Sequence, residues 1–258
     1  MKHNIIIPLI TLLLGAFLCA PSVKAQSAYD DNIHVGFEGG LSMSGFSNNI
    51  GPFDKNSPGY SNSAFANASK DIFYGFHGGF TVDKQLGNSF SIYTEFLVNG
   101  RGGSYKIKNN NVVLIDTSGN QTTAYDTYDY ELYYVQLPLM LQYHLPIDGQ
   151  KISYRVYAGL SPAIKIEGKA IYNYYTQGYP DVNTNTQISI LNYVRGFQVS
   201  PVIGFWIAEK HSDLPVKFFG DIRFEYAIQS VFYRSVDTNG ANLQTNMWTV
   251  SFGFGVRF

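Results

Sequence analysis

The sequence predicts an all-β protein: an eight-stranded antiparallel up-and-down transmembrane β-barrel with long extracellular loops and short periplasmic turns. Three observations predict this fold class. Residues 248–258 alternate large apolar residues with small or polar ones, which is typical of a strand whose two faces meet different surroundings. The connections between such segments alternate in length. Aromatic residues and glycine are abundant (20 Tyr, 19 Phe and 25 Gly), whereas charged residues make up only 14%, as suits a closed sheet.

The first residues have the pattern of a secretory signal peptide. Lys2 and His3 precede an apolar run over residues 5–20, and Val23-Lys24-Ala25 ends the segment with a small residue. We therefore expect residues 1–25 to be a signal peptide that is cleaved, and residues 26–258 to form the barrel domain. Cys19, the one cysteine, would leave with the signal, which excludes disulfides and thiol catalysis from the mature chain.

The charge balance argues against nucleic-acid binding. The net charge of the chain is −1, and removal of Lys2 and Lys24 with the signal would lower it to −3. Such a chain lacks the basic surface that nucleic acid requires.

Eight segments of the chain have the strand pattern. The predicted strands are residues 33–43, 71–84, 89–101, 131–145, 151–168, 194–208, 215–229 and 246–258. The connections 85–88, 146–150 and 209–214 are short. The connections 44–70, 102–130, 169–193 and 230–245 are long. Because the strand count is even, both termini and the short turns are expected on the periplasmic side.

Each predicted strand has one strongly apolar face. Val135, Leu137, Leu139, Leu141 and Tyr143 are an example from residues 131–145. Alternation alone does not decide which face points inward, since a soluble lipocalin-like barrel would turn the apolar face inside. The terminal phenylalanine, the unequal connections and the tyrosines near strand ends favour an apolar face toward lipid.

The final strand carries a candidate assembly signal. A terminal phenylalanine on an alternating strand resembles the sorting signal of bacterial outer-membrane barrels. The residues of this signal are Trp248, Phe252, Phe254 and Phe258. The resemblance implies recognition by the barrel-assembly machinery during biogenesis.

The polar faces of the predicted strands place ionisable residues inside the barrel. We expect the acids to pair with the bases, because buried charges persist only when paired and an eight-stranded barrel leaves room for side chains but not for a wide pore. The alternative is a proton or ion path. The candidate lumen charge network comprises Glu38, Glu95, Arg155, Lys165, Asp221, Arg223, Glu225 and Arg257.

The chain resembles the PorT-like outer-membrane β-barrel proteins. The resemblance lies in Tyr133-Tyr134-Val135-Gln136-Leu137-Pro138-Leu139, in residues 91–102, in Tyr157-Ala158-Gly159 and in residues 221–224. It extends over nearly the whole mature chain and implies a small outer-membrane barrel. The family's namesake takes part in a secretion system, and no motif of this chain singles out that role.

The sequence contains no pattern that predicts catalysis or cofactor binding. Small lipid-modifying barrels use a histidine with a serine and an acid at the outer rim, and no histidine lies in the long connections. Gly159-Leu160-Ser161-Pro162-Ala163 lacks the second glycine of a nucleophile elbow. No histidine or carboxylate spacing fits a metal site. We therefore expect no catalytic, cofactor or metal-binding residues.

The predicted function is that of a non-enzymatic integral outer-membrane protein with a structural, adhesion/recognition or assembly role. The alternatives are an outer-membrane lipid-modifying enzyme and a narrow channel. The expected partners are outer-membrane lipid and a protein or glycan at the extracellular loops. Residues 109–130 and 169–193, in two of the long connections, are rich in tyrosine and asparagine, which suits either an adaptable recognition surface or ordinary solvated hairpins.

Overall fold

The computed structural model describes residues 33–48, 68–115, 117–147, 151–176, 179–209, 216–233 and 245–258, without the side chains of residue 111 and residues 175–184. The expected signal peptide, residues 1–25, lies outside these described residues. Within them, no helix is long and apolar enough to cross a membrane.

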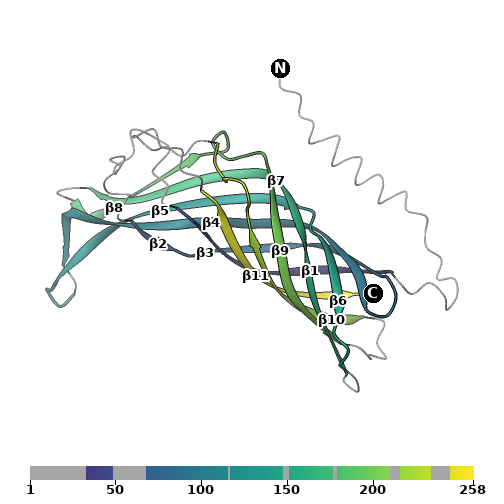
Figure 1. Cartoon of the computed structure of the whole chain (residues 1–258). Coiled ribbons are helices and arrows are strands. Elements are labelled where there is room, and N and C mark those ends of the chain that lie inside the picture. Colours follow the sequence, from purple (N-terminus) through teal and green to yellow (C-terminus); the bar gives the residue numbers. More distant parts are fainter. Residues whose placement is uncertain are drawn as a thin grey trace. The chain divides into compact units, whose positions relative to one another are not determined.

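The described chain is almost entirely strand (Figure 1). The strands are β1 (Ile33–Phe46), β2 (Ser69–Asp71), β3 (Phe73–Gln85), β4 (Phe90–Ile115), β5 (Gln121–Gln136), β6 (Leu139–His144), β7 (Ile152–Thr176), β8 (Tyr179–Ser189), β9 (Phe197–Glu209), β10 (Lys217–Tyr226) and β11 (Met247–Arg257).

Antiparallel pairing closes the sheet into a ring of eight strands, which confirms the predicted fold class. The order around the ring is β1, β3, β4, then β5 and β6 together, β7, β9, β10 and β11. β11 pairs with β1 from Gly36–Arg257 to Phe46–Met247 and so removes both sheet edges. Closure explains how a strand as apolar as β11 can end the chain without exposing unpaired backbone.

β5 and β6 are one barrel strand that is interrupted at Pro138. Proline has no N–H to donate to the ladder, which predicts such a break in pairing. Backbone hydrogen bonds to both neighbouring strands are nevertheless retained at this point: Leu137 N donates to Pro162 O at 3.0 Å, and Glu95 N donates to Pro138 O at 3.2 Å. The Thr94 hydroxyl also donates to Pro138 O, at 2.9 Å, so this one polar residue on an apolar face is satisfied locally.

The apolar faces point outward. Leu139 of β6 is 51% exposed, whereas its neighbour Met140 is 2% exposed. The same alternation of exposed and buried residues holds along β4, β9 and β10, with phenylalanine and isoleucine prominent outside. The charged side chains of these strands therefore lie inside the barrel, together with a buried apolar cluster, and the lipid-facing side is apolar.

Two of the predicted long connections are largely strands, which corrects the expectation that residues 102–130 and 169–193 are loops. β4 and β7 contain 26 and 25 residues, against about 9–11 needed to cross a bilayer. Beyond the ring, β4 pairs with β2 and β5, and β7 pairs with β5 and β8. Figure 1 shows these strands continuing together past the ends of the shorter strands. We call this part the outer extension.

The outer extension has its own core. The inward side chains of β1, β4, β5 and β7 are aromatic there, and they pack against the segment that follows β10. Phe46 lies 5.5 Å from Phe232 and 6.1 Å from Tyr130, measured between ring centroids. Tyr128 and Tyr172 lie 5.1 Å apart. These packed rings explain why strand pairing continues beyond the ring instead of ending in solvated loops.

Candidate functional site: the barrel lumen

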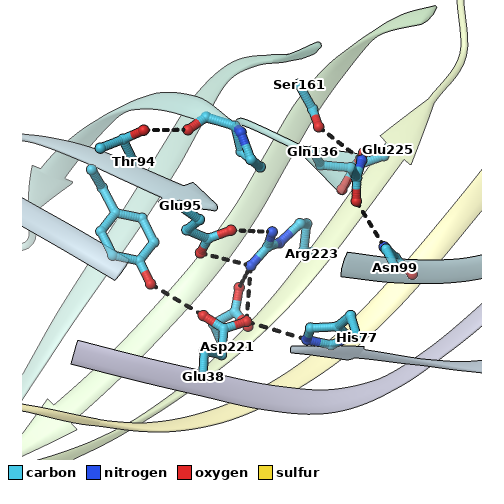
Figure 2. A network of polar contacts seen from close by, with 12 residues as sticks. Glu38, His77, Thr94, Glu95, Asn99, Gln136, Ser161, Asp221, Arg223 and Glu225 are labelled. Carbon is cyan, nitrogen blue, oxygen red and sulfur yellow. Dashed lines mark hydrogen bonds and ion pairs between the residues drawn. The ribbon is translucent and has the colours of Figure 1, made fainter. Parts of the chain in front are cut away.

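The lumen is centred on one buried arginine that contacts three carboxylates (Figure 2). Arg223 of β10 forms two hydrogen bonds with Glu95 of β4, from Nη1 to Oε2 at 2.5 Å and from Nη2 to Oε1 at 2.9 Å. Its Nη2 also donates to Glu38 Oε1 at 3.0 Å and to Asp221 Oδ2 at 3.2 Å. The planar guanidinium, with five donors, suits such a multiple contact better than an ammonium would.

Aromatic and histidine side chains complete this cluster. The Tyr93 hydroxyl donates to Glu38 Oε2 at 3.1 Å, and the Tyr157 hydroxyl donates to Asp221 Oδ2. His77 Nε2 lies 3.2 Å from Glu38 Oε1. Gly253 of β11 makes the arrangement possible, because a Cβ at this position would overlap carboxylate oxygens of Glu38 and Asp221.

A second polar layer lies between this cluster and the outer extension. Glu225 accepts a hydrogen bond from Arg101 Nη2 at 2.6 Å and another from Gln136 Nε2 at 3.2 Å. Gln136 also donates to Ser161 Oγ at 3.0 Å and accepts from Asn99 Nδ2 at 2.9 Å. This layer joins β4, β5, β7 and β10 across the barrel interior (Figure 2).

A third layer closes the short-turn end of the lumen. Asp83 Oδ2 accepts from Arg155 Nη1 at 2.5 Å and lies 3.5 Å from Arg257 Nη1. Both guanidinium groups lie over the Trp206 ring, with Cζ at 4.2 Å (Arg155) and 4.8 Å (Arg257) from its centroid. Phe219 stacks on the same tryptophan with a centroid distance of 5.6 Å.

Lys165 lies apart from the lumen charge network, which corrects its assignment there. Its Nζ donates to the backbone oxygens of Leu191 and Val194, near the outer extension. Lys165 is opposite the inward-facing Tyr134, but the segment that follows β8 lies beside it, and backbone oxygens of that segment bind its ammonium in place of a lumen carboxylate. A β-bulge follows: Tyr133 pairs with Glu167, so Ile166 is an extra residue. The bulge shifts the inside–outside alternation of β7, and Glu167 is exposed.

The other seven residues of the candidate network have buried side chains inside the barrel. Arg223 pairs with Glu38, Glu95 and Asp221 of the same network, but two members pair with residues outside it. Glu225 pairs with Arg101, which lies at the end of a predicted strand, and Arg155 pairs with Asp83. The sequence does place Arg101 on the same face as Glu95, six residues along one strand, and this alternation is the signal that could have identified it.

The candidate assembly residues lie on the outer face of β11. Phe252, Phe254 and Phe258 have exposed rings, and Trp248 is half-buried against Gly45. Phe258 N donates to Val35 O at 2.9 Å, so the last residue is held by β1. Its ring lies 6.4 Å from that of Phe37 in an edge-on arrangement.

Electrostatics outside the ring are those of a solvated surface. Asp71 of β2 and Lys106 of β4 form a half-exposed ion pair at 2.5 Å. The hydrogen bond from Lys106 holds the pKa of Asp71 below its usual value, and the same bond raises the pKa of Lys106. No cluster of three or more histidine, aspartate or glutamate side chains in the described part of the chain is placed to hold a metal ion.

Several solved outer-membrane proteins match the chain at low sequence identity. Ail, the attachment invasion locus protein of Yersinia pestis, solved with the heparin analogue sucrose octasulfate, is 12% identical over 88% of this chain and 99% of its own (TM-score 0.37). OprG from Pseudomonas aeruginosa is 10% identical over 87% and 95% (TM-score 0.41). The outer membrane protease OmpT from Escherichia coli is 13% identical over 91% and 99% (TM-score 0.42). No curated protein sequence matches the chain.

A family model provides the assignment. The model of the outer membrane protein beta-barrel domain matches residues 24–233, which is most of the chain. The match agrees with the closed eight-stranded ring, the apolar outer surface and the polar lumen. The chain belongs to the outer membrane protein beta-barrel domain family and is an integral protein of the outer membrane.

Proposed function

We propose that this protein is a non-enzymatic, non-conducting barrel that presents its outer extension as a surface for adhesion or recognition at the cell exterior. The observation that carries the proposal is the continuation of β4, β5 and β7 well beyond the ring, around a buried aromatic core. A rigid scaffold that holds variable hairpins above the membrane is the usual arrangement of a binding surface.

The packing of the lumen supports a non-conducting barrel. The outer end is filled by the aromatic core around Tyr130 and Phe232, and the short-turn end by Trp206 with Arg155 and Arg257. Between them, Arg223 connects strands on different sides of the ring. Opening a path would separate buried ion pairs, which is costly when one partner is left alone.

The exposed face of the outer extension suits polar partners. Neighbouring strands bear alternating charges, since Glu131 of β5 pairs in register with Lys169 of β7, and Lys169 lies 2.8 Å from Glu167. Asn185 and Asn173 are joined at 2.7 Å. Such a surface of amides, hydroxyls and mixed charges can hydrogen-bond a glycan or a protein surface.

Truncation of the β4–β5 hairpin tests the proposal. Lys108 and Tyr125 are register partners, so residues 109–124 can be replaced by an Asn-Gly turn that keeps the hairpin register. We expect Gram-negative cells displaying the full chain to bind at least one glycan or protein on an array, and the truncated variant to bind it at least tenfold less. Binding no stronger than that of cells without the protein, or equal binding by both variants, would refute a recognition role.

A conductance measurement tests the closed lumen separately. We expect the full chain in planar bilayers to carry no steady ion current. Trp206→Ala removes the ring that both Arg155 and Arg257 contact at the short-turn end of the lumen. We expect this variant to conduct ions, so it serves as the control that the measurement can detect an opened lumen. A steady current through the unaltered protein would favour the narrow channel.

One observation supports an enzyme as the second candidate. Ser91 Oγ lies 3.0 Å from His144 Nε2, the distance between a nucleophile and its base. Ser91, however, is fully buried, and its hydroxyl also lies within hydrogen-bond distance of Gln142 Oε1 and Arg155 Nη1. A serine in this position serves packing better than attack on a lipid. Release of fatty acid from labelled lipid vesicles, abolished by Ser91→Ala, would favour the enzyme instead.

The PorT-like resemblance supports a third variant of the proposal, an assembly role. It rests on the interrupted strand from Tyr133 to Leu139, which in this structure is the β5–β6 junction. If the chain purifies from native membranes together with partner proteins in a stable complex, it is a component of an assembly machine. If it purifies without partner proteins, the free-standing barrel is favoured.

A further inference from the structure

The lipid-facing surface is hollowed beside the last strand. Phe254 of β11 is 75% exposed. Its register partner on β10 is Gly220, which in turn pairs with Ile207 of β9. Because Gly220 has no side chain and faces outward, the surface drops between two large apolar residues.

This depression forms a groove of about 450 Å³. Ile152, Ile207, Phe218 and Phe254 provide its apolar lining, and Gly220 lies among them. The volume falls within the range of about 300–1,000 Å³ that is common for small-molecule sites. The groove lies on the outside of the barrel, which is embedded in lipid, so an apolar chain is available to fill it.

Two opposite charges border the groove at one end. Lys151 and Glu209 both line it, and they lie at the short-turn ends of β7 and β9, where Ile152 and Glu209 are register partners. Short turns lie at the periplasmic rim of such barrels, so these side chains reach the level of the inner-leaflet headgroups. No ion pair among the described residues joins Lys151 to Glu209.

We propose that this groove is a specific binding site for a phospholipid with a zwitterionic phosphoethanolamine headgroup, taken from the periplasmic leaflet. One acyl chain fills the space over Gly220, Lys151 binds the phosphate, and Glu209 accepts N–H hydrogen bonds from the primary ammonium, which the quaternary ammonium of phosphocholine cannot donate. The charges of Lys151 and Glu209 favour this occupant over a second copy of the chain. An interface between two copies would need neither charge at the end of an apolar groove. The proposal rests on the membrane location and does not depend on a recognition role.

A matched pair of glycine variants tests the acyl-chain site. Gly220→Leu places a side chain in the groove, and a Cβ there meets its neighbours at 3.6–3.7 Å, which is ordinary contact. Gly39→Leu is the control. Gly39 also faces outward and pairs with Phe254, but on the β1 side, where a Cβ lies 3.7 Å from His77 O.

The full chain and its variants are reconstituted in vesicles with equal parts of phosphatidylethanolamine, phosphatidylglycerol and phosphatidylcholine of identical acyl chains. They are then extracted in mild detergent and measured by native mass spectrometry. We expect one retained phosphatidylethanolamine per barrel, at least fivefold less in Gly220→Leu, and no change in Gly39→Leu. Heat-modifiable migration in gels checks that each variant is folded.

The headgroup contacts are tested by Lys151→Gln with Glu209→Gln, at the rim where folding is least affected. We expect this double variant to lose its preference for phosphatidylethanolamine over phosphatidylcholine while still retaining lipid. Equal retention by Gly220→Leu and Gly39→Leu, retention without headgroup preference in the unaltered chain, or a dimer mass that disappears with Gly220→Leu would each overturn the proposal.

Discussion

Arg223 and Glu95, which are 128 residues apart in the sequence, meet in a two-bond ion pair near the middle of the barrel. Both side chains are almost completely buried. The pair links β10 to β4, strands that are not neighbours in the ring. A contact of this kind can form only when the ring is closed, so its energy is coupled to closure.

Replacement of Arg223 by alanine should therefore destabilise the barrel strongly. The change leaves Glu95, Glu38 and Asp221 buried without their shared cation, and breaking a buried pair in this way costs about 3–5 kcal/mol. The measurement is denaturant unfolding of the barrel in lipid vesicles. Lys106→Ala is the control: it removes one partner of the half-exposed pair with Asp71 and should cost no more than about 1 kcal/mol. Similar costs for the two variants would mean that the cluster contributes little to closure.

The position of the membrane on the outer surface of the barrel can be tested with two exposed aliphatic residues, one expected to face lipid and one expected to face water. Leu139 and Ile115 are 51% and 72% exposed. Leu139 lies on the ring of strands and faces lipid, where arginine costs about 2–4 kcal/mol near the bilayer midplane. Ile115, at the end of β4 in the outer extension, faces water, and Ile115→Arg should stay within about 0.5 kcal/mol. If refolding in vesicles shows equal losses of stability for the two variants, the membrane boundary is misplaced.

Met140 is not a suitable inward control for that experiment. Its side chain packs with Tyr93, Tyr157 and Trp206 in an apolar cluster inside the barrel. Met140→Arg would therefore overpack a filled space, whereas the alternation in the sequence suggests only that Met140 points to a polar lumen.

Orientation can be tested with two glycines at hairpin tips. Gly87 and Gly119 both have positive φ, 93° and 83°, and both have open space where a Cβ would be. Cysteine at either position carries the same backbone strain, so differences in labelling report location. We expect a membrane-impermeant thiol reagent to label Gly119→Cys on intact cells and Gly87→Cys only after the outer membrane is permeabilised. The opposite result would invert the barrel.

Local alternation in the sequence was sufficient to predict the ring, because inside and outside differ at every second residue. Alternation was insufficient to predict the outer extension, because one face of its strands is solvated and the buried side chains on the other face are mostly tyrosines. Tyr128, Tyr130 and Tyr172 are buried, yet in sequence they resemble a solvated recognition loop. Lys165 was misplaced for a different reason: alternation puts it opposite the inward-facing Tyr134, but a period-two pattern does not show that backbone oxygens of Leu191 and Val194 bind its ammonium. Pairing partners such as Arg101 and Glu225 depend on the register across the lumen, which one strand alone does not specify.

Deletion of Phe258 tests whether this residue matters for folding stability or for recognition by the assembly machinery. Deletion of Phe258 removes a partly exposed ring and the hydrogen bond from its N to Val35 O at 2.9 Å. Even full burial of such a side chain is worth only about 1.5–3 kcal/mol, so spontaneous folding of the deletion variant in detergent should be nearly normal. Its resemblance to a sorting signal implies a larger loss of folded protein in cell membranes, measured by heat-modifiable migration.

Two controls separate the backbone from the ring in this experiment. Phe258→Leu keeps the bond to Val35 and an apolar side chain but removes the aromatic ring, whereas Phe224→Leu removes an exposed aromatic ring from the neighbouring strand β10, outside the candidate assembly signal. Recognition of the terminal aromatic predicts poor cellular assembly for the deletion and for Phe258→Leu, with normal assembly for Phe224→Leu. Wild-type levels of assembly after deletion would remove the assembly signal, and equal losses in cells and detergent would mean that Phe258 acts through packing against Phe37.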